Sequence, residues 1–191
     1  MAKIGLNNFR YSKLTESETG TATYAGAKKP ARAVSCKVSV STSSASLYAD
    51  DVLAESDTSF NNGTVTIGID EEDNATMADL LGHTLAEEGG EMVRNANDVS
   101  PYVGLGRVIV KMVNGVRKYK VEFLCKVKFS EPSQDDKTKG ENVEFTTSEL
   151  EGTVSTLADG TWSKTKTFDT QAEAIKYLEG LMAAPGAVPG H

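Results

Sequence analysis

The chain has 191 residues, and 27 acidic against 20 basic side chains give it a formal net charge of −7. This length suits one large domain that buries a full hydrophobic core. The acidic balance argues against a dedicated duplex-binding module, because such modules show a basic footprint and a pI above ~9. Two histidines and two cysteines without metal-ligand spacing argue against a zinc site.

The charge is unevenly distributed along the chain. Residues 1–35 carry six cations and two anions, residues 36–101 carry two cations and thirteen anions, and the remainder balances. Such blocks are either solvated faces or complementary surfaces of copies that pack head to tail. The sequence contains no apolar run of ~18 residues and no signal-peptide core, so we expect a chain made in the cytosol that lies in no membrane.

The first third of the chain predicts strands joined by a long loop. Residues 1–15 are expected to form a basic N-terminal arm, ahead of a single β domain over 16–182. Residues 34–40 and 64–69 alternate apolar and polar side chains, which is typical of half-buried strands. Between them, the acidic and Ser-rich stretch 41–62 predicts a long loop.

Two helices are predicted among the strands. The first covers about 74–82, where an apolar stripe follows a capping residue at Asn74 and Gly82 supplies a stop. The second covers about 170–182, opened by the capping box that Thr170 and Glu173 form. Its stripe of apolar residues predicts an amphipathic helix that lies on the sheet.

Two hairpins are predicted in the second half. Residues 102–129 alternate on both sides of Asn114-Gly115, a type I′ turn signal. This hairpin is expected to have one buried face and one polar face, and the polar face carries lysines and the cross-strand pair Arg107–Glu122. A second hairpin is expected to turn at 159–160 and join 150–157 to 161–168.

These elements predict a mainly β fold, an antiparallel β-sandwich or partial barrel with the two helices beside it. A polar loop is expected over 131–141 and a flexible Pro/Gly/Ala-rich tail over 183–191.

The sequence carries little sign of chemistry. Phosphate-binding loops and nucleophile elbows do not occur, and His83 is expected to donate to the last carbonyls of the first helix. The acidic run 70–74 departs from the calcium-loop pattern at its third and sixth positions, Glu72 and Ala75. We therefore expect no catalytic, cofactor-binding or metal residues and no enzyme, with a small hydrolase of unrecognised carboxylates as one alternative.

A set of short segments in fixed order carries a resemblance to a known family. They are 47–51 (LYADD), 80–84 (LLGHT), 101–106 (PYVGLG), 128–133 (KFSEPS) with 138–140 (TKG), and 143–147 (VEFTT) with 150–153 (LEGT). The ordered set, over about residues 34–155, resembles the major tail proteins of long-tailed, non-contractile bacteriophages.

The resemblance implies hexameric rings that stack into a tail tube around a tape-measure protein, bounded by tail terminator and distal tail proteins. Four strands from each of six subunits would close a lumen wall roughly 150 Å around and about 45–50 Å across. Genome DNA would pass as cargo without specific binding, along an acidic lumen that repels phosphates. The lysines on the 102–129 hairpin fit such a wall poorly. The protein would be assembled in the bacterial cytoplasm and remain in the virion tail.

For contacts between subunits, the opposite charges of the loop 41–62 and the arm 1–15 suggest ring-to-ring partners. The candidate residues are the loop carboxylates Asp50, Asp51, Glu55 and Asp57 and the arm cations Lys3, Arg10 and Lys13. The main alternative from another class is a β-sandwich adhesin or carbohydrate-binding module on a virion or cell surface, which would expose clustered aromatic residues.

Overall fold

The computed structural model describes residues 2–30, 33–49, 52–69, 73–86, 90–133 and 148–184. It confirms the mainly β class, since eight described strands form one open antiparallel sheet in the order β2-β1-β7-β8-β9-β4-β3, with β10 also paired to β8. These strands are β1 (Ala2–Glu16), β2 (Ala22–Tyr24), β3 (Ala33–Ala49), β4 (Val52–Ile69), β7 (Tyr102–Val113), β8 (Val116–Phe129), β9 (Ser148–Ser155) and β10 (Ser163–Phe168). A small separate ribbon pairs β5 (Thr84–Leu85) with β6 (Met92–Val93).

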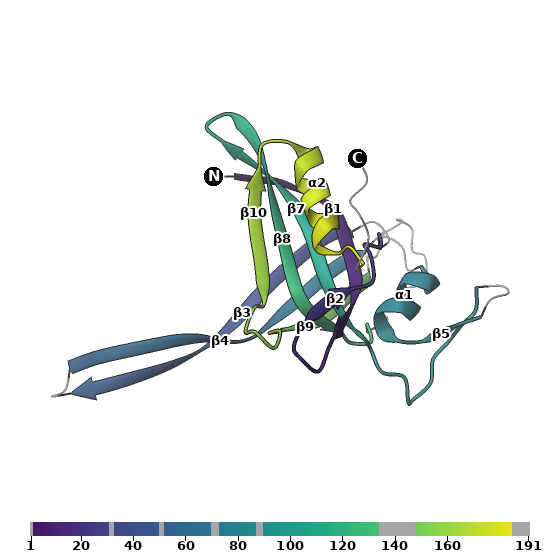
Figure 1. Ribbon diagram of the computed structural model, residues 1–191, viewed down its shortest axis with the longest axis horizontal. Helices are drawn as coiled ribbons and strands as arrows, with labels where there is room; N and C mark the ends of the chain where they lie inside the picture. The colour runs from purple at the N-terminus through teal and green to yellow at the C-terminus, as the bar shows by residue number, and fades with distance from the viewer. Residues whose placement is uncertain are drawn as a thin grey trace, which may run out of the picture.

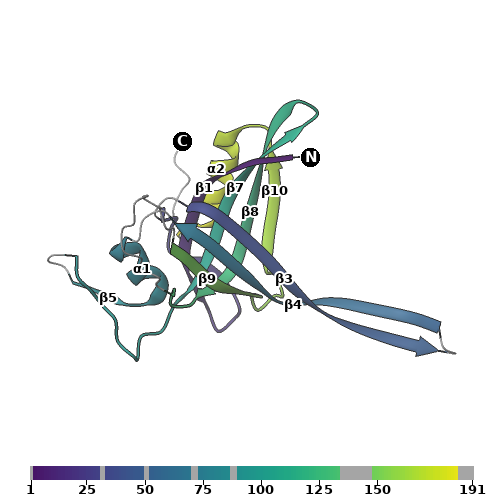
Figure 2. The same cartoon turned by 180° about the vertical axis from the view of Figure 1, so that it is seen from behind.

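One edge of β8 is shared by two strands, and this divides the sheet into two layers. β10 pairs with β8 from Tyr119 to Leu124, and β9 pairs with it from Lys126 to Phe129. β9 leads on to β4 and β3, which cross one face of the sheet, while the helix α2 (Gln171–Leu181) covers the opposite face (Figure 1). Figure 2 shows the β3–β4 side from behind. The arrangement is a partial barrel that does not close.

An irregularity in β8 places a core on each face. The Cα register shifts by one residue between Val103 and Leu105, so β8 contains one extra residue there. Phe123 therefore packs toward α2, whereas Phe129 packs into the core between the two layers. The prediction of a polar face is wrong for the part of the 102–129 hairpin that lies away from its turn. There, the register partners Leu105 and Leu124 are both buried.

The predicted helices are confirmed within one residue at each end. α1 (Asn74–Leu81) is capped by Asp73, one residue earlier than expected, and ends at Gly82 in the left-handed conformation, with φ 81°. α2 begins after Thr170, whose hydroxyl accepts from the Glu173 N–H. Its close approach to the sheet depends on Gly106, where a Cβ would lie 2.2 Å from Leu178 Cδ1.

The predicted N-terminal arm is instead the strand β1. It pairs with β7 from Ala2 to Lys13 and places Phe9 and Tyr11 in the core. Two register shifts, one between Lys3 and Gly5 and one between Asn7 and Arg10, interrupt its alternation. These bulges remove the two-residue period by which the sequence would have revealed a strand.

The predicted loop 41–62 is wrong as well, because its described residues continue β3 and β4 as one long hairpin. The pairing runs from Ser41↔Asn62 to Ala49↔Val52. β4 leaves β9 at Gly63, so its last eleven residues toward the tip, 52–62, pair only with β3. At ~3.3 Å per residue, the hairpin projects about 36 Å beyond the shared sheet (Figure 1). A projection outside the core needs no apolar alternation, which explains why its composition looked like a loop.

The predicted hairpin around 159–160 is correct only at its turn. The Leu157 N–H donates to the Thr161 carbonyl at 2.9 Å, but the flanking strands part, since β9 joins β4 and β10 joins β8. Trp162 stacks on Phe60 of β4, with ring centroids 4.8 Å apart, rather than opposing Leu157. The segment 143–147 that contributes to the family resemblance, most of the predicted loop 131–141 and most of the predicted tail 183–191 lie outside the described residues.

Candidate assembly surfaces

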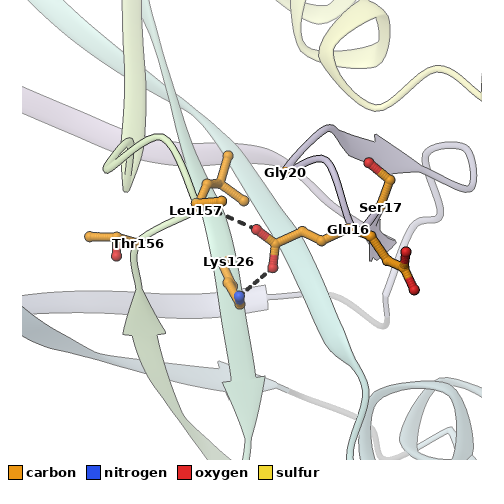
Figure 3. A pocket seen from close by; sticks show the side chains of 8 residues that line it. Glu16, Ser17, Gly20, Lys126, Thr156 and Leu157 are labelled. Carbon is orange, nitrogen blue, oxygen red and sulfur yellow. Dashed lines mark hydrogen bonds and ion pairs between the residues drawn. The ribbon is translucent and has the colours of Figure 1, made fainter.

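One pocket among the described residues surrounds an internal ion pair. A shallow, open pocket of about 290 Å³ lies beside the Glu16 carboxylate (Figure 3). That carboxylate accepts from the Ala158 N–H at 3.2 Å and pairs with Lys126 Nζ, which also lies 4.7 Å from the centroid of the Tyr102 ring. Glu16 and Lys126 therefore compensate each other's charge within the chain.

His83 holds two segments together rather than capping α1 with its side chain. Its backbone N–H donates to the Ala78 carbonyl at 3.1 Å, while its ring lies between two carboxylates. Nδ1 is 2.7 Å from Asp98 Oδ2, and Nε2 lies against Glu131 on the opposite side of the ring. The hydrogen bond from His83 holds the pKa of Asp98 below its usual range. Among the described residues, no group of three or more His, Cys, Asp or Glu side chains is arranged so that it could hold a metal ion.

Two of the three candidate cations are engaged within their own chain. Lys13 Nζ lies 2.8 Å from Asp79 Oδ1, and Lys28 pairs with the other oxygen of that carboxylate. Burial opposes ionisation of Asp79, but the two lysines outweigh it and hold its pKa below the usual range. Arg10 Nη2 lies 3.7 Å from the Glu179 carboxylate on α2. These pairs attach β1 to both helices.

The remaining candidates lie at the two extremities of the fold. Lys3 is in register with Lys111 of β7. Glu55 and Asp57 belong to β4, in the projecting part of the hairpin, where they are in register with Leu47 and Ala45 of β3. The structure therefore does not bring the candidate cations and carboxylates together within one chain. Asp50 and Asp51 lie outside the described residues.

Arg107 joins the two layers, and the sequence predicted only half of its contacts. The predicted pair is confirmed, because Arg107 Nε donates to Glu122 Oε2 at 2.9 Å. Its Nη1 also donates to the Cys36 carbonyl of β3 at 2.9 Å, a contact across the layers that local spacing cannot reveal. Although burial opposes the charge of Glu122, Arg107 outweighs it and keeps the pKa of that carboxyl low.

Several strands have an edge that no other described strand pairs with. β3 ends the strand order and is paired only with β4 along its 17 residues. β10 is paired only with β8, and β1 has a neighbour on its outer side only from Tyr11 onward, through Lys28 and β2. Exposed backbone N–H and C=O groups on such edges are templates for pairing with another chain.

A scan against protein-family models and a search of the curated proteins find no match to this chain. None of the described helices has the length and apolar character needed to cross a membrane.

Proposed function

We propose that this chain is a major tail protein, the subunit whose hexameric rings stack into the tail tube of a long-tailed bacteriophage. The observation that carries the proposal is the combination of an open sheet with a hairpin that leaves it. A two-stranded ribbon of this length gains little stability on its own in water, so its natural role is to contact another chain. Head-to-tail contact between identical copies generates rings or tubes.

The open edges support the lateral contacts within a ring. β1 and β10 are the outer strands around β7 and β8, and successive pairings are all antiparallel. β1 and β10 therefore run in opposite directions. If β10 of one copy lies beside β1 of the next, the strands continue an antiparallel sheet across the boundary without any change of direction. Closing a ring in this way removes edges that a lone subunit would expose.

The hairpin supports the contacts between rings. Its reach of about 36 Å lies beyond the sheet that the subunit shares with β9, so the hairpin is free to contact a copy in the next ring. The 41–62 segment contains four carboxylates and no basic residue, so its partner surface should be cationic.

The adhesin alternative gains no comparable support. Of the large hydrophobic residues that are exposed in the described chain, Tyr102 alone is aromatic, and the others are spread over distant segments. A glycan-binding surface would gather aromatic side chains.

Electron microscopy of the purified protein, concentrated and then examined in negative stain, tests the proposal. We expect hollow tubes or six-fold rings. Monomers at every concentration would count against the tail-tube function, and binding to a glycan array by such monomers would favour the alternative.

A further inference from the structure

A positively charged sector lies at the end of the sheet where β7 turns into β8. It comprises residues 107–113 of β7, 116–124 of β8 and 163–169, which contain β10. Seven basic and two acidic side chains occur in this sector, although the whole chain has a net charge of −7. The turn end of β7 and β8 stands clear of β3 and β4, which cross the sheet further from the turn (Figure 2).

Three lysines of the sector share the sheet face opposite α2. Lys111 of β7 and Lys118 of β8 are register partners, so their side chains project from the same face, about 5 Å apart. Lys120 follows two residues later on β8 and projects from that face about 7 Å from Lys118. The residue next to it, Val121, packs in the core beneath α2, which places the three lysines on the other side. We call them the lysine triplet.

The chain itself compensates the triplet only in part. Lys118 pairs with Asp169, whose side chain is 76% exposed. Lys120 Nζ lies 3.6 Å from the carboxylate of Glu122, which is already paired with the guanidinium that joins the two layers. Lys111 forms no ion pair with an acidic residue in the described part of the chain. Like charges directly opposite each other destabilise a sheet, so an anion from outside the chain would relieve about two uncompensated charges.

The composition of the sector indicates which kind of anion fits. A protein partner is normally held by apolar anchors, and charged residues are depleted at the centre of such an interface. Of the large hydrophobic residues that are exposed in the described chain, Val116 at the turn is the one that lies in the sector. A surface with charge and few exposed apolar side chains suits a polyanion that binds through charge alone. The DNA duplex, with one negative charge per ~1.7 Å of its axis, is the densest regular polyanion of this kind.

From this charge pattern we infer that Lys111, Lys118 and Lys120 bind the phosphate backbone of DNA without reading its sequence. Lysines contact phosphates as point charges, and such contacts carry no base information. The inference goes beyond the proposed function, in which DNA only passes through the tube, and it departs from the expectation of a wall that repels phosphates throughout. The acidic remainder of the chain keeps each contact weak. In a tube the contact would repeat in every subunit, so that DNA is guided and released from one copy to the next.

The salt dependence of DNA binding tests the inference. A short fluorescent DNA duplex is titrated with the protein at several low concentrations of potassium chloride, and its anisotropy is measured. Two uncompensated charges predict a slope of about −2 for the logarithm of the association constant against the logarithm of the salt concentration. Lys111→Gln leaves both ion pairs of the triplet intact and should make the slope less negative by about one. Lys111→Glu/Lys118→Glu should weaken binding at least about tenfold.

A matched control separates the triplet from the net charge. Lys29→Glu/Arg94→Glu makes the same charge change on two exposed residues outside the sector, so it should keep the slope and stay within about threefold of the wild-type affinity. Circular dichroism melts show whether each variant is folded. A fluorescent polyglutamate chain stands for an acidic protein segment and should bind more weakly than the duplex.

The outcomes for the inference and for the tail-tube function are distinguishable. No DNA binding at the lowest salt concentration, a slope that Lys111→Gln leaves unchanged, or equally tight binding of polyglutamate would overturn the inference. Electron microscopy of the same samples scores assembly separately. Tubes without DNA binding would leave the function standing, whereas DNA binding by a protein that never forms rings would count against the function alone.

Discussion

Shortening the projecting hairpin should separate folding from assembly. Ser43 and Ser59 are register partners, with their hydroxyl oxygens 3.0 Å apart. Replacing residues 44–58 by Asn-Gly between them would close the hairpin with the same two residues that form the β7–β8 turn. The stack of Phe60 on Trp162 remains outside the deletion.

The structure predicts a small effect on stability and a large one on assembly. The deletion removes seven residues of β4 and about 23 Å of reach, together with all four carboxylates of the segment. None of the deleted residues pairs with β9. The free energy of unfolding should therefore change by less than about 1 kcal/mol, since the deleted ribbon is marginal by itself and a shorter connection slightly favours folding.

The assay combines thermal unfolding, the fluorescence of the single tryptophan and electron microscopy. The shortened protein should melt like the wild type, keep the emission of Trp162 and fail to stack into tubes. If it stacks with unchanged spacing, the hairpin is not the contact between rings. If it fails to fold, the hairpin is needed for folding, and the separation of a folded domain from a hairpin used only for assembly is wrong.

Three further predictions concern the body of the fold. Arg107→Leu leaves the half-buried Glu122 without its guanidinium partner and should lower the free energy of unfolding by about 2–4 kcal/mol in urea titrations; an unchanged midpoint would show that the layers do not depend on this residue. Gly104→Ala would place a Cβ 2.7 Å from the Phe123 ring and should lower the free energy of unfolding by about 1–3 kcal/mol in the same titrations. In the control Gly115→Ala, the new Cβ would have no neighbouring atom within 4 Å, so only the strain of the left-handed turn conformation should appear. Because the pKa of Asp79 is lowered in the folded state, its contribution to stability is complete above the unfolded value of ~4 and is lost as the pH falls through the folded value. Melting temperatures from pH 7 to pH 3 should thus fall less steeply for Asp79→Asn than for the wild type, and identical slopes would contradict the role of its lysine partners.

Elements with local signals could be predicted from the sequence. The capping box of α2 and the Asn-Gly turn between β7 and β8 each act within a few residues, so the local pattern was enough to predict them. The pair Arg107–Glu122 followed directly from the register that this turn imposes.

Features that depend on distant strands could not be predicted. The one-residue irregularity in β8 reverses which face its side chains occupy, and the bulges of β1 hide its period. The strands that flank 159–160 part because β9 pairs with β4 and β10 pairs with β8. No local pattern in the sequence shows these distant partners. Of the candidate contacts, Lys13 and Arg10 found partners on helices that no local spacing relates to β1.

The most direct test of the central claim is cryo-electron microscopy of the concentrated wild-type protein. Hollow tubes built from six-fold rings are expected, with a hairpin from each subunit reaching into the adjacent ring. Monomers at all concentrations, or tubes in which the hairpins contact only subunits of their own ring, would contradict this claim.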